Sequence, residues 1–234
     1  MTFTQPQIDL LQWLTVFIIM LKFVLICALA AKLYQKHKQQ SLEVTDFFVG
    51  VFIFFITLFI SRIIFFYFDF YLTDLDTANY LIGSNLMYWR IGSLVTGFGI
   101  GFLLIVVDKL VLKFKLKGIL GYIVIGVGIL HLFYPVYTLD DFWTLSLIST
   151  VTGISIMIIP IFFLYLGIKV PGSRTVAFLM AIGSILYAIA GLGISETVLG
   201  LFGEDIRSII IIIMTVVRAG SLIMMALASV KLHV

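Results

Sequence analysis

Charged residues are scarce in this chain of 234 residues. Asp, Glu, Lys and Arg make up 12% of it, whereas a soluble domain normally carries about 25%. Hydrophobic residues make up 62% and the mean hydropathy is +1.20. The composition excludes a water-soluble globular protein, and it leaves almost nothing for a soluble catalytic or nucleic-acid-binding domain beside the apolar segments.

Cysteine and histidine are also rare, and the common catalytic motifs are missing. Cys27 is the single cysteine, which excludes an intramolecular disulfide and a cysteine-based metal site. Of the three histidines, His37 and His233 fall at one edge of the predicted membrane segments and His131 near the other. The sequence has no G-x-S-x-G, no H-E-x-x-H, no P-loop and no dinucleotide fingerprint. We therefore expect no enzymatic activity, no cofactor and no metal.

What the chain does contain is a series of long apolar runs. Each is long enough to cross a hydrocarbon core of about 30 Å as a helix, and a run such as 47–60 is apolar on every side, unlike the alternating strand of a membrane barrel. We predict an all-α fold, a polytopic bundle of seven transmembrane helices in the cell membrane that forms one domain over residues 1–234. The predicted helices cover residues 10–34, 47–68, 86–107, 118–137, 143–168, 175–194 and 208–230.

The distribution of charge predicts the orientation of these helices, because basic residues near helix ends stay on the cytoplasmic side. Alternate connections carry the lysines, and the opposite set carries most of the acidic residues with only Arg207 as a basic one. We expect the N-terminus outside and the C-terminus inside, with a basic face toward anionic lipid rather than toward nucleic acid. The inner set is Lys32, Lys36, Lys38, Lys109, Lys113, Lys115, Lys117, Lys169, Arg174 and Lys231; the outer acidic set is Asp9, Asp69, Asp74, Asp76, Asp140, Asp141, Glu196, Glu204 and Asp205.

Short sequence matches about 130 residues apart suggest an internal duplication. Trp13 matches Trp143, Leu33-Tyr34 matches Leu164-Tyr165, and Arg90-Ile91-Gly92-Ser93-Leu94 matches Arg218-Ala219-Gly220-Ser221-Leu222. Two parallel repeats, 10–107 and 143–230, would then be joined by the linker helix 118–137, a 3+1+3 plan. In a chain so rich in Leu, Ile and Gly, chance is the alternative explanation.

This plan is similar to that of the SWEET and PQ-loop transporters and, with its outer N-terminus, to that of microbial rhodopsins. Their motifs are missing: Pro6-Gln7 precedes the first helix, Pro160 is followed by Ile161, and the last helix has Arg218 and no lysine for a retinal Schiff base. Over most of its length the sequence resembles uncharacterised seven-helix membrane proteins of archaea, most clearly in Ser61-Arg62-Ile63-Ile64-Phe65 and from Tyr88-Trp89-Arg90 to Asp108-Lys109. That resemblance implies a fold and no activity.

Ionisable residues inside a membrane segment are functional candidates because each costs about 2.5–3.5 kcal/mol near the bilayer centre. Here they are cationic: Lys22 and Arg218 fall near the middle of their helices, and Arg62 and Arg90 about two turns toward the outer side. The central parts of the spans hold no Asp or Glu, which argues against proton- or cation-coupled transport. Unpaired cations instead suit an anion, for which Arg offers a bidentate fork.

Structural roles remain open for the same residues. Lys and Arg can snorkel, Arg62 and Arg90 could pair with Asp69, Asp74 or Asp76, and Arg218 could bind backbone carbonyls. His131 is either a satisfied buried side chain or a ligand. Helix 143–168 has a polar stripe that lines a pathway or bonds to a neighbouring helix, with Ser146, Ser149, Thr150 and Gly153.

We therefore expect a small anionic or amphiphilic ligand, a free solute or a lipid headgroup, near Lys22 and Arg218. A facilitative transporter or channel is one function that fits. A receptor-like sensor is the alternative, with a cytoplasmic protein partner at Lys109, Lys113, Lys115 and Lys117. A structural subunit of a membrane complex is a third.

Overall fold

The fold is built from helices that lie along a common axis. The computed structural model describes residues 4–39, 46–194, 196–199, 202 and 204–231, and within these ranges it contains eight α-helices and no strand. The helices are α1 (Gln5–Gln39), α2 (Phe47–Tyr67), α3 (Asn85–Leu112), α4 (Ile119–Phe133), α5 (Leu139–Lys169), α6 (Arg174–Gly193), α7 (Glu196–Leu199) and α8 (Glu204–Lys231). A short π-helix, η1 (Phe68–Leu72), extends α2.

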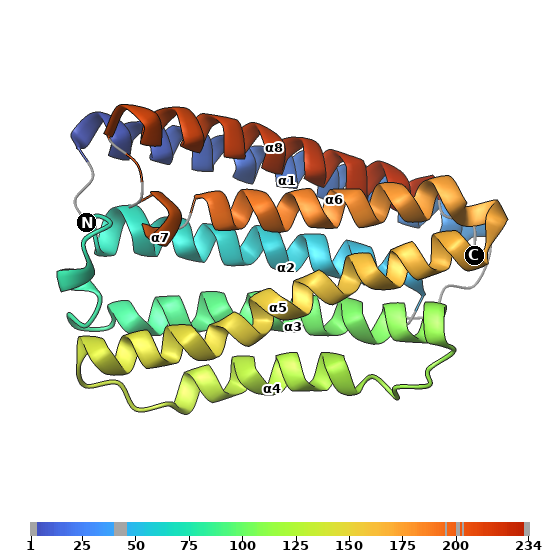
Figure 1. The fold of residues 1–234 in the computed structure, drawn as a ribbon, viewed down its shortest axis with the longest axis horizontal. Helices are drawn as coiled ribbons and strands as arrows, with labels where there is room; N and C mark the ends of the chain where they lie inside the picture. Colours follow the sequence, from blue (N-terminus) through green and yellow to red (C-terminus); the bar gives the residue numbers. More distant parts are fainter. Residues whose placement is uncertain (1–3, 40–45, 195, 200–201, 203, 232–234) are drawn as a thin grey trace.

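Consecutive long helices run in opposite directions along the bundle (Figure 1). We call the end that holds the start of α1, η1 and α7 the N-terminal end, and the end that holds the end of α8 and the α3–α4 connection the C-terminal end. In order around the bundle, α1 packs on α2, α2 on α3, α3 on α4 and α5, α5 on α6, α6 on α8, and α8 on α1. Residues that lie far apart in the sequence, on α1 and α8, are therefore neighbours.

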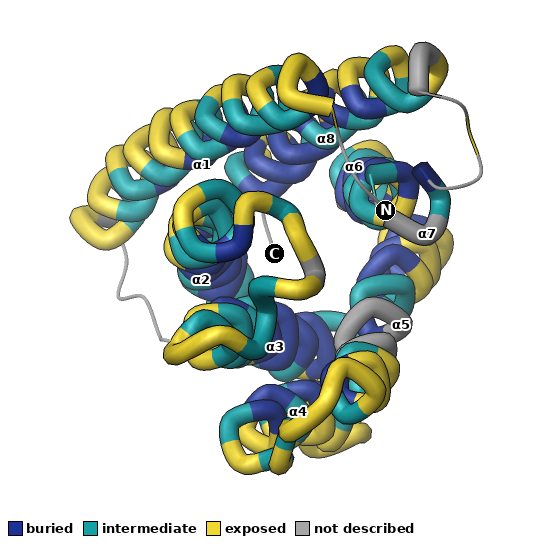
Figure 2. The backbone as a smooth tube through the Cα atoms, turned by 90° about the vertical axis from the view of Figure 1, so that its left-hand side faces the viewer, coloured by how far each residue is buried: buried dark blue, intermediate teal, exposed yellow. Residues whose placement is uncertain are grey.

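The outer surface of the bundle is apolar. The exposed parts of the helices point away from the bundle centre and the buried parts inward (Figure 2). Large hydrophobic side chains are nevertheless among the most exposed, for example Trp13 (74%), Leu147 (72%) and Val216 (65%). A surface of this kind is stable against lipid and not against water.

Five helices in the described ranges are long and apolar enough to cross a membrane: α1, α2 with η1, α3, α6 and α8. Together with the apolar surface, they confirm the prediction of an all-α integral membrane protein. One predicted span, 118–137, is shorter as the apolar helix α4, whereas α5 has 31 residues over Leu139–Lys169.

The difference at α4 has a local cause. The sequence predicts a helix over 118–137, but α4 ends at Phe133, with Tyr134 in an extended conformation at φ −63° and ψ 124°. Pro135 follows, and a residue before proline is sterically kept out of the α-helical region. Fifteen residues of α4 rise only about 22 Å at 1.5 Å per residue, less than the hydrocarbon thickness.

Helices α3 and α4 approach each other through glycines. A Cβ atom added at Gly101 would lie 2.6 Å from the backbone oxygen of Gly121, and one added at Gly121 would clash with the backbone oxygen of Gly101. Gly97 and Gly128 continue the same contact with slightly more room. The Gly97-x-x-x-Gly101 pair thus marks a contact within the chain, as small residues do where lipid removes the hydrophobic drive for association.

Helix α5 begins at a capping box. The Thr138 side chain accepts the N–H of Asp141, and the Asp141 carboxylate accepts the N–H of Thr138. A hydrogen bond from the N–H of Tyr137 and the bonds from Thr138 stabilise the ionised form, so the pKa of Asp141 lies below its ordinary value. The box fixes the start of α5 at the N-terminal end of the bundle.

Candidate functional site

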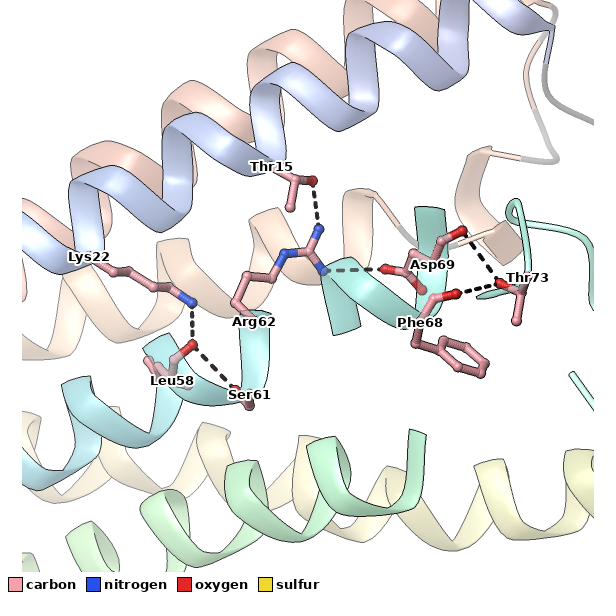
Figure 3. A network of polar contacts seen from close by, with 8 residues as sticks. All are labelled: Thr15, Lys22, Leu58, Ser61, Arg62, Phe68, Asp69 and Thr73. Carbon is pink, nitrogen blue, oxygen red and sulfur yellow. Dashed lines mark hydrogen bonds and ion pairs between the residues drawn. The ribbon is translucent and has the colours of Figure 1, made fainter. Parts of the chain in front are cut away.

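Lys22 lies on α1 and is turned into the bundle. Its side chain is 3% exposed, and Nζ donates a hydrogen bond to the backbone oxygen of Leu58 on α2 at 2.9 Å (Figure 3). The Ser61 hydroxyl donates to the same oxygen at 3.3 Å. The ammonium group therefore stays inside the bundle instead of snorkelling to an interface, and it joins α1 to α2.

Arg62 lies one turn of α2 beyond Leu58 and connects three elements. Its Nη2 atom donates to the Thr15 hydroxyl of α1 at 2.8 Å, and Nη1 lies 3.7 Å from a carboxylate oxygen of Asp69 in η1 (Figure 3). Asp69, Asp74 and Asp76 were the acidic partners predicted for Arg62, and the structure pairs it with Asp69. Nε of Arg62 is buried and has no hydrogen-bond partner, so the pairing leaves part of the guanidinium unsatisfied.

Arg218 lies at mid-length of α8, opposite α6. Its Nε atom is buried without a hydrogen-bond partner, and the centre of its guanidinium lies 5.7 Å from the centroid of the Tyr187 ring on α6, a cation–π contact. The side chain as a whole is half-buried because it lines a cavity. Within the described part of the chain, an aromatic ring and a cavity lie against Arg218.

This cavity lies toward the N-terminal end of the bundle, where α1, α2, η1, α6, α7 and α8 meet. Its volume is about 260 Å³, and a smaller one of about 20 Å³ adjoins it along α1 and α8 and reaches Thr15 and Thr215. Arg62 and Arg218 line both. The remaining lining of the larger cavity is Asp69, Gly191, Leu11, Phe70, Leu75, Tyr80, Ile194 and Leu199.

Gly191 gives the cavity its access to Arg218. A Cβ atom built there would meet Nη2 of Arg218 at 3.4 Å, so the absence of a side chain keeps that face of the guanidinium open. Sequence reasoning missed Gly191, and also Thr15 and Tyr187, since no spacing rule in the sequence indicates which α6 residue faces α8. The acidic residue of the site, Asp69, was considered only as an outer ion-pair partner.

Arg90 and His131 lie elsewhere, where α3 packs on α4. Nη1 of Arg90 donates to the backbone oxygen of Leu132 at 3.2 Å and Nη2 to that of Tyr134. These are carbonyls that the C-terminus of α4 leaves without helical partners. His131 is buried, with its ring centroid 5.7 Å from that of Trp89. The structure thus separates these two candidates from Lys22, Arg62 and Arg218.

The polar stripe on α5 is described only in part. Ser146 is half-buried. The side chains of residues 149–154, which include Ser149 and Thr150, lie outside the described part of the structure, and the position of Gly153 falls in the same range. The helix continues through Pro160 without interruption. A pathway along α5 therefore stays a prediction.

At the C-terminal end, the α3–α4 connection presents its lysines to solvent. Lys109, Lys113, Lys115 and Lys117 are exposed. Asp108, buried at the end of α3, accepts the backbone N–H of Gly118 at 2.8 Å and that of Leu116 at 3.4 Å. Two acidic residues, Asp108 and Asp46, lie at this basic end. Asp108 organises the loop that displays the lysines.

Comparison with known proteins gave no match: no protein-family model, no curated protein and no solved structure is similar to this chain. Among the residues that the structure describes, no group of three or more His, Cys, Asp or Glu side chains could hold a metal ion. The functional argument therefore rests on the cavity and on the charges that line it.

Proposed function

We propose that this protein crosses the cell membrane seven times, with the N-terminal end of the bundle outside, and that it binds a small anionic or amphiphilic solute in the cavity at Arg218. A facilitative transporter or channel is the function that this site supports best. The observation that carries the proposal is Arg218 itself, a guanidinium that faces a cavity and whose Nε has no hydrogen-bond acceptor.

The physical argument concerns the cost of a buried cation. An ion taken out of water loses several kcal/mol of solvation unless an opposite charge and good hydrogen bonds compensate it. Arg62 has Asp69 and Thr15, and Lys22 has a carbonyl oxygen. Among the described residues Arg218 has the face of Tyr187, and its Nε has no hydrogen-bond partner. A carboxylate or phosphate oxygen in the cavity would satisfy it with charge-assisted hydrogen bonds.

Two further features favour movement of the solute over simple binding. The cavity lies near one end of the bundle, and its continuation along α1 and α8 reaches Ile18, one turn of α1 before Lys22. A series of cations at increasing depth would offer an anion successive sites. A duplication of the helix triplets α1–α3 and α5, α6, α8 would fit such a transporter.

A receptor-like sensor is the second proposal, and the α3–α4 loop favours it. Asp108 holds a loop in which Lys113, Phe114 and Lys117 adopt positive φ angles. A loop ordered in this strained form and carrying exposed lysines suits an acidic protein partner on the cytoplasmic side.

Ligand binding and flux separate these functions. The purified protein should gain thermal stability from at least one member of a panel of small anions, because a ligand that binds only the folded state stabilises it. A panel of monocarboxylates, alkyl sulfonates, inorganic phosphate and dicarboxylates serves the purpose. A transporter would then show counterflow of the stabilising anion in proteoliposomes, and a sensor would bind it without flux. A panel that stabilises nothing contradicts the proposed anion site.

The orientation has its own test by cysteine labelling. In a Cys27→Ala background, Asp76→Cys should react with a membrane-impermeant maleimide on intact cells, and Lys115→Cys should react only after the membrane is opened. Both positions are exposed, on connections at opposite ends of the bundle. The reverse pattern would invert the proposed topology, and reaction of both on intact cells would contradict an odd number of crossings between them.

A further inference from the structure

We infer that the cavity selects a monovalent anion with a compact apolar body, and that Asp69 sets this charge preference. The inference rests on the proposed anion site and adds the class of ligand that the site takes. It follows from the charges and the shape of the lining.

Among the described residues of the lining, the charges add up to a single positive one. Arg62 and Arg218 each carry one positive charge, and Asp69 carries one negative charge 3.7 Å from Nη1 of Arg62. Lys22 does not line the larger cavity, and its Nζ donates to Leu58. One anionic group on Arg218 would therefore make the occupied cavity neutral.

A second negative charge on the ligand would meet two penalties. The described lining would offer it no further cation, since Asp69 already compensates Arg62, and an unpaired ion away from water is costly. It would also face the Asp69 carboxylate, and like charges brought together cost several kcal/mol in a site of low polarity. The same lining with a neutral residue in place of Asp69 would instead suit a dianion.

The rest of the lining indicates the body of the ligand. Leu11, Phe70, Leu75 and Leu199 are apolar, and they surround a volume of about 260 Å³. That is slightly below the range of about 300–1,000 Å³ that is usual for drug-sized ligands. The anionic group would lie at Arg218, where Gly191 leaves room, and a small aliphatic or aromatic body would fill the apolar part.

Two probes of similar size test the charge preference, 4-bromobenzoate with one carboxylate and terephthalate with two. We expect the wild-type protein to bind 4-bromobenzoate on the order of tenfold or more tightly than terephthalate, since a second unpaired charge is penalised. Asp69→Asn keeps the shape of the side chain and raises the charge of the lining by one, so it should reverse the order. Asp74 is exposed and is not among the lining residues, so Asp74→Asn should leave the order unchanged.

The outcomes distinguish this inference from the proposed function. If neither probe nor any other anion stabilises the wild type, the anion site fails and the inference with it. If both probes bind the wild type equally well, or if Asp69→Asn keeps the wild-type order, the anion site stands and the charge preference is wrong.

The position of the anionic group beside Gly191 has a separate test, which does not require that the Asp69→Asn variant folds. Gly191→Val places methyl groups beside Nη2 of Arg218 and should weaken binding of 4-bromobenzoate at least tenfold, about 1.4 kcal/mol. Gly220→Val on α8 is the matched control, because a Cβ atom there meets nothing within 4 Å. Equal affinity in the two variants would show that the ligand does not occupy the space at Gly191.

Discussion

Replacement of Arg218 by alanine should abolish the stabilisation of this protein by anions. The variant removes the cation that faces the cavity without a hydrogen-bond acceptor for its Nε. Because hydrogen bonds to a charged group contribute about 1.5–3 kcal/mol, affinity for 4-bromobenzoate should fall roughly 10- to 100-fold. The melting temperature of the detergent-purified variant should then no longer rise with the anion, although it rises for the wild type.

Arg90→Ala is the matched control for this prediction. Arg90 is also an arginine inside the bundle, but its guanidinium donates to the carbonyls of Leu132 and Tyr134 and does not line the cavity. We expect this variant to be less stable, because it leaves two partly buried carbonyls without their donor, and to keep the full response to anions. An anion response that survives Arg218→Ala, or that disappears equally in both variants, would contradict the assignment of the site to Arg218.

Gly101→Ala should destabilise the contact between α3 and α4 severely. The new Cβ atom would lie 2.6 Å from the backbone oxygen of Gly121 and 2.7 Å from Cγ1 of Ile125, and the backbone of α4 cannot move away without losing its other contacts. Overpacking of this kind costs about 1–3 kcal/mol or more. The melting temperature or the midpoint of denaturation in mixed micelles measures the loss.

Gly126→Ala on α4 separates the clash from the change in helix propensity. A Cβ atom at Gly126 meets nothing within 4 Å, while alanine favours a helix over glycine by up to about 1 kcal/mol at both positions. Gly126→Ala should therefore be neutral or slightly stabilising. If the two variants had the same stability, α3 and α4 would not pack as the structure has them.

The membrane class of the fold follows from the sequence, because burial in lipid requires long apolar helices and leaves few alternatives. The residues at which the helices begin and end are predicted less accurately from the sequence. The predicted helix 10–34 is α1, which extends over Gln5–Gln39, since Lys and Gln continue a helix beyond the apolar run. The predicted helix 118–137 ends early at Phe133, since Pro135 stops it and hydropathy does not register that effect.

The sequence indicates which charged residues are candidates for the site. It does not indicate which side chains or carbonyls each of them contacts. The cost of a charge in lipid singles out Lys22, Arg62, Arg90 and Arg218 from the sequence. Which of them has an acceptor depends on tertiary contacts, and the matched segments at Arg90 and Arg218 show this: Arg90 meets the end of α4, whereas Arg218 meets Tyr187 and a cavity. No pattern within one sequence distinguishes these two environments.

The most direct test of the anion site is a crystal structure of the protein with 4-bromobenzoate, in which the anomalous signal of bromine locates the ligand. We predict bromine density among the apolar residues of the cavity, with the carboxylate within about 3 Å of the Arg218 guanidinium. A cavity that stays empty at a ligand concentration that stabilises the protein, or bromine bound only elsewhere on the bundle, would contradict the account.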